Sequence, residues 1–413
     1  MYFCQNFYVK LLILTSRFPY PLEKGDKLRI FHQIRELSSQ HDIVLCSLCE
    51  EAIQDVDFQQ IKKYCSAVYL FPLSKKTIFF NILRNILRGL PFSVSYFFNT
   101  KIQKNLLEIM QKENPDHIYC QLIRTAEYIK NTPYAKTLDY MDTFSAGMAR
   151  RAESEFFLLK PFYQIETFLL KKYEKAIAPF FNHKTIISQQ DKNLLGVSEI
   201  KIIPNGVDLD FFKENSLSVI CYSLSNERNA KPGNSNSKPF NITFVGNLGY
   251  YPNVQAAKFL VKSILPLLKH EMPNIKILIA GARPTHEILS LANDNVTIKS
   301  WLPDIREAYS QANMFVAPIF HGSGQQNKIL EAMAMGLPCV TTSLVNNAIL
   351  ATPEKAILLA DTEGVFALQI LKLLQDIDYQ ILVKNNARTF VETHYSWASS
   401  VVELNDILQT KLK

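Results

Sequence analysis

Residues suited to binding an anionic ligand lie within positions 320–342, which read FHGSGQQNKILEAMAMGLPCVTT. The apolar run NMFVAP before them is typical of a buried parallel strand. A glycine-bearing loop that follows a strand and opens a helix presents backbone N–H groups to anions. Gly322 and Gly324 let the chain approach closely, Lys328 adds a positive charge, and Glu331 follows one turn along the helix. The spacing predicts a ligand with phosphates next to hydroxyls, and a nucleotide-sugar fits that description.

A second group of candidate residues lies between the first predicted strand and the first helix, at positions 15–37. Its single glycine, Gly25, stands where the helix begins, with Lys27 and Arg29 close behind. A G-x-G-x-x-G dinucleotide fingerprint is absent. A helix N-terminus with adjacent basic residues predicts a phosphate contact. The alternative for Arg29 is a solvated helix residue.

A third group follows the strand predicted at 241–245, in the segment ITFVGNLGYYPNVQAAKFL. Gly246 and Asn247 come directly after the strand, where ligands bind in open α/β sheets. We therefore expect both residues to face a crevice between domains. Asn253 is a favourable N-cap residue for the helix that follows.

Residues 74–104 contain six basic residues and no acid. Their apolar residues are spaced for one face of a helix, and basic, aromatic amphipathic helices often lie at an anionic membrane surface. The alternative is an ordinary amphipathic helix packed on the sheet.

Composition bounds the protein class. The 413 residues suffice for two or three domains, and the net charge of +7 is compatible with phosphate-bearing substrates. No nucleic-acid-binding motif accompanies the basic residues. Seven scattered cysteines indicate a reducing compartment, and Cys46 and Cys49 form a lone C-x-x-C that we interpret as strand packing. Two D-x-D triplets, at 55–57 and 208–210, are interpreted as chance. We expect no metal site, no signal peptide and a cytoplasmic protein.

Apolar runs alternate with helical patterns along most of the chain, which predicts parallel sheets with crossover helices. The expected fold class is α/β, with two Rossmann-like domains. The expected divisions are an N-terminal domain at 1–203, a linker and loop at 204–240, a C-terminal domain at 241–392, and a returning C-terminal helix at 393–413. Among the expected helices is a single long one over 146–180.

Three motifs resemble glycosyltransferase family 4, whose members have the two-domain GT-B fold. They are IIPNGVDLDFF, FVGNLGYYPN and KILEAMAMGLPCVTT. The chain ending HYSWASSV also looks like the family's terminal helix, which crosses back to the first domain across a central crevice. Within the family, SRFPYPLEKGDKLRIFHQIREL and GSGQQNKILEAMAMG look like sugar transferases associated with exopolysaccharide and exosortase loci.

The resemblance implies that the second domain binds a nucleotide-sugar donor and the first domain binds a glycan or lipid-linked acceptor. Glu331 matches the second glutamate of the family's E-x7-E motif, which holds the ribose, whereas Ser323 stands where the first glutamate would fall. Lys328 is a candidate for the missing diphosphate-binding arginine and lysine. Gly25 matches the glycine loop of the first domain, and no histidine follows the fourth strand, which ends at Cys120.

The resemblance further implies hexosyl transfer, in the retaining mode, for cell-surface glycan synthesis. That chemistry needs no protein nucleophile and, with lysine and amides around the diphosphate, no metal ion or other cofactor. The expected location is the cytoplasm, with peripheral association at the inner face of the membrane through residues 74–104. Two alternatives stay open: a nucleotide-sugar 2-epimerase of the same fold, and a non-catalytic nucleotide-sugar-binding member.

Overall fold

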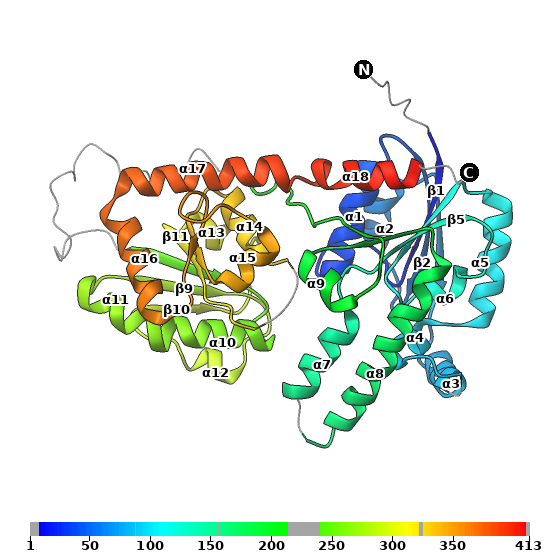
Figure 1. The fold of residues 1–413 in the computed structure, drawn as a ribbon, viewed down its shortest axis with the longest axis horizontal. Helices are drawn as coiled ribbons and strands as arrows, with labels where there is room; N and C mark the ends of the chain where they lie inside the picture. Colours follow the sequence, from blue (N-terminus) through cyan, green and yellow to red (C-terminus); the bar gives the residue numbers. More distant parts are fainter. Residues whose placement is uncertain (1–7, 87, 155–156, 214–239, 322–324, 410–413) are drawn as a thin grey trace. The chain divides into compact units, whose positions relative to one another are not determined.

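The chain forms two separate compact units in a computed structural model (Figure 1). The model describes residues 8–86, 88–154, 157–213, 240–321 and 325–409. The N-terminal unit is Met1–Gly206 together with Trp397–Lys413, and the C-terminal unit is Val207–Ser396. The chain therefore leaves the first unit once and returns to it at its end.

A parallel sheet of seven strands, in the order β3-β2-β1-β4-β5-β6-β7, forms the centre of the N-terminal unit. The strands are β1 Lys10–Thr15, β2 Asp42–Cys49, β3 Ala67–Pro72, β4 His117–Gln121, β5 Ala135–Asp139, β6 His183–Ile186 and β7 Ile200–Ile202. Strand β1 pairs with both β2 and β4, so the order in which successive strands are added to the sheet reverses at β1. In open parallel sheets the carboxyl edge at such a reversal is where ligands bind.

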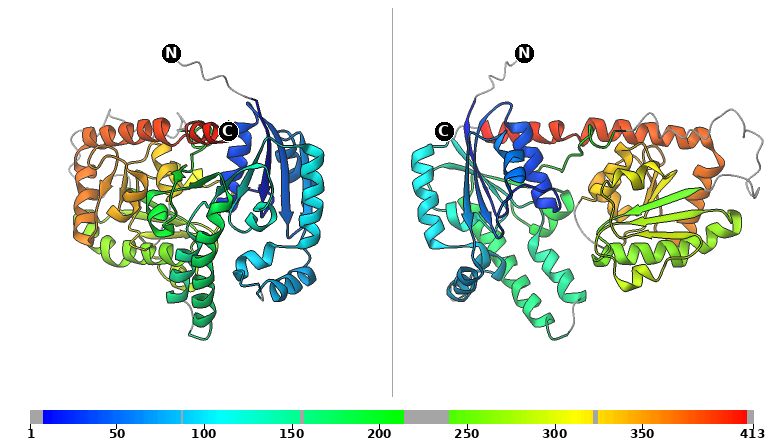
Figure 2. Two further views of the ribbon diagram at one scale, coloured as in Figure 1. Left: turned by 45° about the vertical axis from the view of Figure 1, so that its right-hand side comes forward. Right: turned by 180° about the vertical axis from the view of Figure 1, so that it is seen from behind.

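Helices cover both faces of this sheet (Figure 2). They are α1 Gly25–Leu37, α2 Asp55–Lys62, α3 Lys75–Ile86, α4 Phe92–Phe97, α5 Thr100–Glu113, α6 Ala126–Ile129, α7 Phe144–Ser154, α8 Lys160–Ile177 and α9 Gln189–Leu195, with a short 3-10 turn at Ala178–Phe180. Alternate residues of β1 show the two faces. Leu11 and Ile13 pack with α1, whereas Leu12 and Leu14 pack with α5. Such near-continuous apolar strands are expected where both faces are buried.

The single long helix expected over 146–180 is wrong, because the segment forms two helices, α7 and α8. They pack against each other and project from the sheet as a hairpin (Figure 1). Pro161 lies in the first turn of α8. Proline is favoured at a helix start and disfavoured in a helix interior, so this residue marks the division in the sequence.

The C-terminal unit is built on a parallel sheet in the order β10-β9-β8-β11-β12-β13. Its strands are β8 Asn241–Val245, β9 Lys276–Ala280, β10 Val296–Lys299, β11 Met314–Ala317, β12 Cys339–Thr341 and β13 Leu358–Leu359. Its helices are α10 Tyr251–Phe259, continued by a π-helical turn at Leu260–Ile264 and by α11 Leu265–Glu271, then α12 His286–Leu289, α13 Arg306–Ser310, α14 Asn327–Ala334, α15 Ser343–Ile349, α16 Glu363–Gln375 and α17 Ile377–His394. These two sheets confirm the α/β class and the two Rossmann-like domains. Residues 214–239 of the expected loop lie outside the described residues.

The last helix, α18 Trp397–Gln409, packs on α1 of the N-terminal unit. The indole of Trp397 is 2% exposed and stacks on the His32 ring, with 4.8 Å between ring centroids. Gly206 makes a close approach possible here, because a Cβ on it would lie 2.6 Å from the backbone of Trp397. This contact confirms that the C-terminal helix returns to the first unit.

The C-x-x-C pair lies on β2, with the two side chains on opposite faces of the sheet. Cys46 belongs to the core that includes Leu12, and Cys49 to the core that includes Leu11. Strand residues three apart point in opposite directions, so these thiols do not converge on one ion. Among the helices that the structure describes, none is both long and apolar enough to cross a membrane.

Candidate functional site

Five residues at the carboxyl edge of the C-terminal sheet form what we call the β8–α14 cluster: Gly246, Asn253, Tyr309, Lys328 and Glu331. Gly246 follows β8, and the others lie on α10, α13 and α14. Strands β8 and β11 are neighbours, so the turns after them meet at one edge of the sheet. This is the reversal point of the sheet and the expected position of a ligand.

Lys328 is held in place by the side chain of Asn253. Its ammonium Nζ donates to Asn253 Oδ1 at 2.5 Å, and the Nδ2 group of the same amide donates to the Asn247 carbonyl at 2.9 Å. The ammonium also lies 5.3 Å from the centroid of the Phe244 ring. Desolvation lowers the pKa of Lys328 to about 8, against the opposing effect of Glu331. A positioned, poorly solvated ammonium is well suited to bind a phosphate oxygen.

Glu331 accepts a hydrogen bond from the Tyr309 hydroxyl at 2.8 Å through Oε2. Tyr309 is fully buried and contacts the Phe315 ring on β11, so the phenol orients one oxygen of the carboxylate. Burial raises the pKa of Glu331, while the hydrogen bond from Tyr309 and the charge of Lys328 act in the other direction. Only part of the Glu331 side chain is solvent-accessible, and Oε1 has capacity for donors such as hydroxyls.

Two glycines give the cluster its close packing. A Cβ at Gly246 would lie 2.8 Å from Asn253 Nδ2 and 3.0 Å from Lys328 Nζ. A Cβ at Gly281, after β9, would lie 1.7 Å from the Gly246 carbonyl oxygen, and Gly281 has φ +149°. Gly281 therefore fixes the backbone turn, and Gly246 leaves the space that Lys328 occupies.

The other predicted residues of this unit are only partly described. Gly322, Ser323 and Gly324 lie outside the described residues. Asn247 is exposed beside the cluster, and its side-chain oxygen accepts from the Gly249 amide at 3.0 Å. The prediction that Asn253 is an N-cap is wrong, because α10 begins two residues earlier, at Tyr251.

Gly25 and Lys27 belong to the N-terminal unit and lie at the start of α1. A Cβ on Gly25 would lie 3.3 Å from Met141 Cε, so this glycine allows α1 to approach the segment after β5. Lys27 Nζ lies 3.5 Å from the Tyr20 carbonyl oxygen and is partly exposed. Both residues are in unit one, so they do not belong to the β8–α14 cluster.

The phosphate contact predicted for Arg29 is corrected by the structure. Its side chain is 0% exposed and pairs with Asp139, with 2.7 Å between Nε and Oδ2. Arg29 Nη1 also donates to Asn205 Oδ1 at 2.9 Å. The guanidinium of Arg29 therefore links α1 to Asp139 at the end of β5 and to Asn205. Because it is buried and already paired, it has no surface open to a ligand.

Sequence reasoning missed Tyr309 and the role of Asn253. Tyr309 lies in the short helix α13, whose pattern gives no sign that its hydroxyl turns toward α14. For Asn253 the sequence did contain a signal. Asparagine carries both a donor and an acceptor, and this one follows the strand-end Gly246 by seven residues, so a hydrogen bond to the loop after β8 could have been expected. Among the described residues, no group of three or more His, Cys, Asp or Glu side chains is placed to hold a metal ion.

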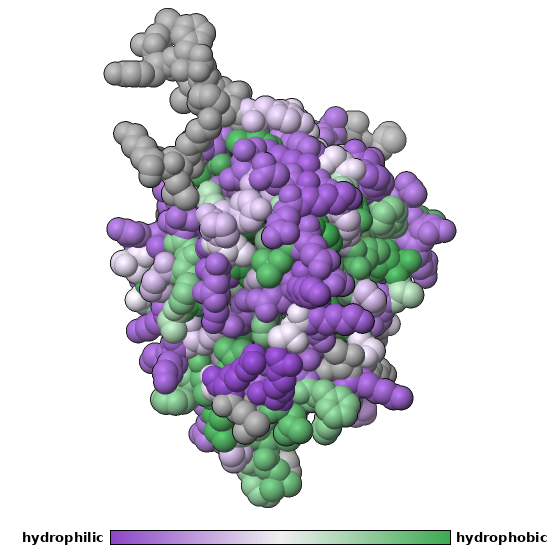
Figure 3. Space-filling view, turned by 90° about the vertical axis from the view of Figure 1, so that its right-hand side faces the viewer, coloured by the Kyte–Doolittle hydropathy of each residue, from purple (hydrophilic) through white to green (hydrophobic). Residues whose placement is uncertain are grey.

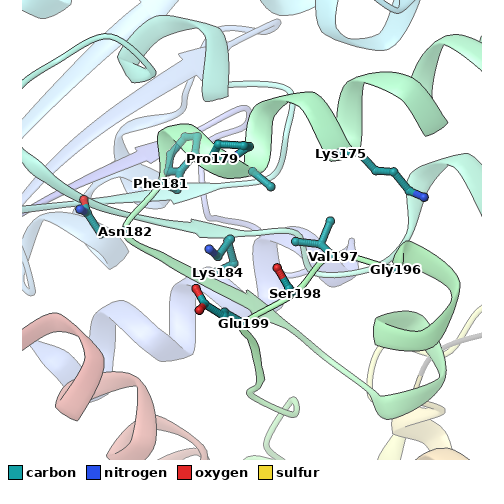
Figure 4. Close-up of a pocket in the computed structure, with 10 residues that line it drawn as sticks. Lys175, Pro179, Phe181, Asn182, Lys184, Gly196, Val197, Ser198 and Glu199 are labelled. Carbon is teal, nitrogen blue, oxygen red and sulfur yellow. The ribbon is translucent and has the colours of Figure 1, made fainter.

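A pocket of about 530 Å³ opens elsewhere on the N-terminal unit (Figure 4). It is lined by residues that precede β6 and β7, including Phe181, Asn182 and Ser198, and by Lys184 near the start of β6. Those are the amino ends of the strands. The carboxyl ends, where parallel sheets place their substrates, are at the opposite edge, so this pocket is separate from the predicted sites.

Comparison with known proteins shows similarity in sequence and in fold. Residues 239–376 match the family model described as Glycosyl transferases group 1. An "Uncharacterized 44.6 kDa protein in cps region" of Klebsiella pneumoniae is 24% identical over 408 residues, which covers 94% of this chain and 96% of that protein.

Solved glycosyltransferase structures share the fold. Sucrose-phosphate synthase from Thermosynechococcus elongatus superimposes with a TM-score of 0.67 at 14% identity, covering 96% of this chain and 98% of that one. Anabaena HepE in complex with UDP-glucose gives a TM-score of 0.64 at 13% identity, with 97% and 99% covered. WaaG, a glycosyltransferase involved in lipopolysaccharide biosynthesis, gives 0.62 at 14%, also with 97% and 99% covered. At these identities the likeness establishes the fold. The family match covers residues 239–376, within the C-terminal unit, and the likeness of fold extends over nearly the whole chain.

Proposed function

We propose that the protein transfers a hexosyl group from a nucleotide-sugar donor to a lipid-linked or polysaccharide acceptor in cell-surface glycan synthesis, with retention of anomeric configuration. The observation that carries the proposal is the β8–α14 cluster, which sets a desolvated ammonium and an oriented carboxylate at the edge where α/β sheets bind ligands. Supporting it, HepE was solved with UDP-glucose, WaaG acts in lipopolysaccharide biosynthesis, and the Klebsiella relative is encoded in a cps region.

Each residue of the cluster has a role in this proposal. Glu331 accepts hydrogen bonds from the ribose hydroxyls of the donor, and Lys328 binds the diphosphate. When the bond between the anomeric carbon and the diphosphate breaks, negative charge grows on the leaving oxygen, and the ammonium stabilises it. We infer that this charge, with the backbone amide of Gly246, serves in place of a metal ion.

A donor screen tests the proposal. Thermal shifts and nucleotide release are measured with UDP-, GDP-, ADP- and dTDP-sugars. One donor is expected to stabilise the wild-type protein and to release its nucleotide when an acceptor is added. Glu331→Ala is expected to weaken donor use sharply, and Lys328→Ala to lower turnover while leaving the fold intact.

The same screen separates this function from its alternatives. Interconversion of the donor sugar without acceptor would indicate a 2-epimerase. Donor binding without release or epimerisation would indicate a non-catalytic protein. Wild-type transfer by both variants would refute the assignment of Glu331 and Lys328.

We further propose that the N-terminal unit docks on an anionic membrane. Large apolar side chains are exposed on α3 and around the start of α8, and we call this set the apolar–basic surface: Phe79, Phe80, Leu83, Phe157, Leu158, Leu159, Phe162, Ile165 and Phe168, each at least 44% exposed. Hydrophobic residues gather at the lower end of the face seen in Figure 3, where Figure 1 places α3 and the hairpin tip. Large apolar side chains gathered at one end of a protein surface often mark an interaction site.

Charge selects the partner of this surface. The charged residues within 74–104 and 157–172 are all basic except Glu166. Glu166 is 2% exposed and accepts hydrogen bonds from the Phe92 and Ser93 amides, so it adds no negative charge to the surface. Phe162 contacts the Phe92 ring at 4.8 Å between centroids, which ties α8 to α4 beside α3. A basic fringe around exposed phenylalanines complements anionic lipid headgroups.

A further inference from the structure

The pocket at the amino ends of β6 and β7 contains a buried lysine that is paired with no described protein group. Lys184 is 9% exposed and lines this pocket of about 530 Å³. Within the described part of the chain, its ammonium takes part in no hydrogen bond and no ion pair. Lysine is rarely buried this far without a partner, because a desolvated charge is costly. Figure 4 draws Lys184 among the other lining side chains, so the ammonium is open to a molecule in the pocket.

A second ammonium lies at the side of the pocket next to Gly196. Lys175 is exposed in the last turn of α8, and its Nζ would lie 3.8 Å from a Cβ built on Gly196. Among the residues that the structure describes, no carboxylate pairs with Lys175 either. Part of its charge complements the helix C-terminus. The lining therefore carries two ammonium groups against one carboxylate, that of Glu199, and attracts an anionic group.

The lining also holds groups that accept hydrogen bonds. Glu199 directly precedes β7, has φ +54° and is exposed. The helices α8 and α9 end beside the pocket, at Ala178 and Gly196, and helix C-termini carry partial negative charge. A ligand that presented only negative oxygens would be repelled by these groups. The ligand therefore also needs donors, such as hydroxyl groups.

Three further lining side chains suit a hydroxyl-bearing ligand. Asn182 Oδ1 accepts from the Lys136 amide at 2.9 Å, which fixes the side chain and leaves its Nδ2 group as a donor. The Ser198 hydroxyl is exposed and can both donate and accept. Phe181, which is 3% exposed, adds apolar surface to the lining. A sugar ring combines hydroxyl groups with apolar C–H groups, so it fits such a lining.

These features together select the ligand. A neutral sugar would satisfy Ser198 and Glu199 but would bring no charge to Lys184, and inorganic phosphate would meet the repulsion of Glu199. We propose that the pocket binds an anionic sugar unit, a ring that carries one carboxylate or one phosphate. Lys184 contacts the charged group, and Glu199 accepts hydrogen bonds from ring hydroxyls. The binding chemistry rests on the pocket alone, whereas the origin of the sugar, a glycan that the enzyme extends, rests on the transferase function proposed above.

The test measures binding and its location in the full-length protein. Methyl glucuronide, glucose 6-phosphate, neutral methyl glucoside and inorganic phosphate are each titrated at millimolar concentrations by calorimetry. Hydrogen exchange is followed in peptides covering 175–184 and 194–201. At least one of the two anionic sugars is expected to protect these peptides and to bind more tightly, by about tenfold or more, than the neutral glucoside or inorganic phosphate. The tighter of the two identifies the anionic group as carboxylate or phosphate.

Lys184→Met separates a binding role from a structural one. Methionine keeps most of the apolar stem, and removing a buried ammonium without a partner should leave the N-terminal unit as stable as before or more stable. The same variant should lose about tenfold or more of its affinity for the anionic sugar. Lys172→Met, an exposed charge removal on α8 outside the pocket lining, is the matched control and should change neither property.

Unchanged affinity in Lys184→Met overturns the proposal, as does equal protection by inorganic phosphate or methyl glucoside. Protection confined to peptides outside the pocket, or found with no probe, overturns it as well. A lower unfolding midpoint in Lys184→Met would also contradict it, because that result would reveal a structural partner of the ammonium. Failure of the transferase function would instead appear as absence of nucleotide release from every donor.

Discussion

At the scale of single residues, several groups of the C-terminal unit position the ammonium of Lys328. Lys328 is bonded to Asn253, faces the Phe244 ring and occupies the space left by Gly246. Glu331 lies one turn along α14 and is oriented by Tyr309. Of these groups, Lys328 and Glu331 were predictable from the loop and helix pattern. Tyr309 was not, because its role depends on how α13 packs against α14.

The pKa of Lys328 sets a pH dependence. The pKa of Lys328 in the free enzyme is about 8, and only the ammonium form of its side chain binds the diphosphate. The value of kcat/KM for the donor should therefore fall as pH rises through about 8. A pH profile of nucleotide release measures this. Lys328→Arg keeps its charge to much higher pH and should lose that limb of the profile, whatever its absolute rate. A wild-type profile that is flat between pH 7 and about 9 would exclude this role for Lys328.

Gly246 of the β8–α14 cluster and its neighbour Gly281 should respond differently to alanine. In Gly246→Ala the new methyl group meets side-chain ends, so Lys328 moves, donor affinity falls and the fold persists. In Gly281→Ala the methyl group collides with the Gly246 carbonyl oxygen, and alanine is strained at the positive φ of this position. The C-terminal unit therefore loses stability. Donor titration and thermal unfolding of both variants check this contrast. Equal losses of stability would contradict it.

At the scale of elements, the strands were largely predictable and the helix boundaries less so. The strand predicted at 241–245 agrees with the bounds of β8, because a short apolar run between turn residues has few alternative interpretations. The hairpin α7–α8 was missed because the prediction of one long helix gave no weight to Pro161, which is favoured at a helix start and disfavoured in a helix interior. Arg29 was misassigned because a basic residue near a helix start is a typical ligand contact. Its actual partner, Asp139, lies 110 positions away along the chain, so the sequence alone does not reveal the pair.

The packing of α18 on α1 predicts a stability effect. Trp397→Ala removes a ring that is 2% exposed, and it should cost about 3–5 kcal/mol in the N-terminal unit. Hydrogen exchange in α1 peptides under mild urea measures the loss. Val402→Ala, on the same helix but 61% exposed, should change stability by about 0.5 kcal/mol or less. Comparable exchange in the two variants would show that α18 contributes little.

The apolar–basic surface predicts membrane binding that depends on both charge and apolar contact. Wild-type protein should co-sediment with vesicles containing phosphatidylglycerol, less with pure phosphatidylcholine, and less at high salt. The double variant Phe79→Ser, Phe80→Ser should bind about tenfold or more weakly. Leu368→Ser with Leu382→Ser, two exposed leucines of the C-terminal unit, serves as the control. Salt-independent failure of the wild-type protein to bind would leave α3 as a helix without this partner.

At the scale of the whole molecule, the units differ in how the chain supplies them. The C-terminal unit is one continuous stretch, Val207–Ser396, whereas the N-terminal unit needs both ends of the chain. His41 and Asn405, 364 positions apart, share a hydrogen bond of 2.5 Å between Nε2 and Oδ1. Val401, Leu404 and Ile407 of α18 belong to the same apolar core as Leu11 and Ile13 of β1.

This discontinuity has a consequence for synthesis. Domains usually fold in the order in which they leave the ribosome, the first one first. Here the unit translated first stays without its last helix until residues 397–409 have been made, and the face of α1 that receives Trp397 stays uncovered during that time. The unit translated second is therefore the first to have all of its residues. A stop codon before position 397 would deprive the N-terminal unit, not the nearer one, of part of its core.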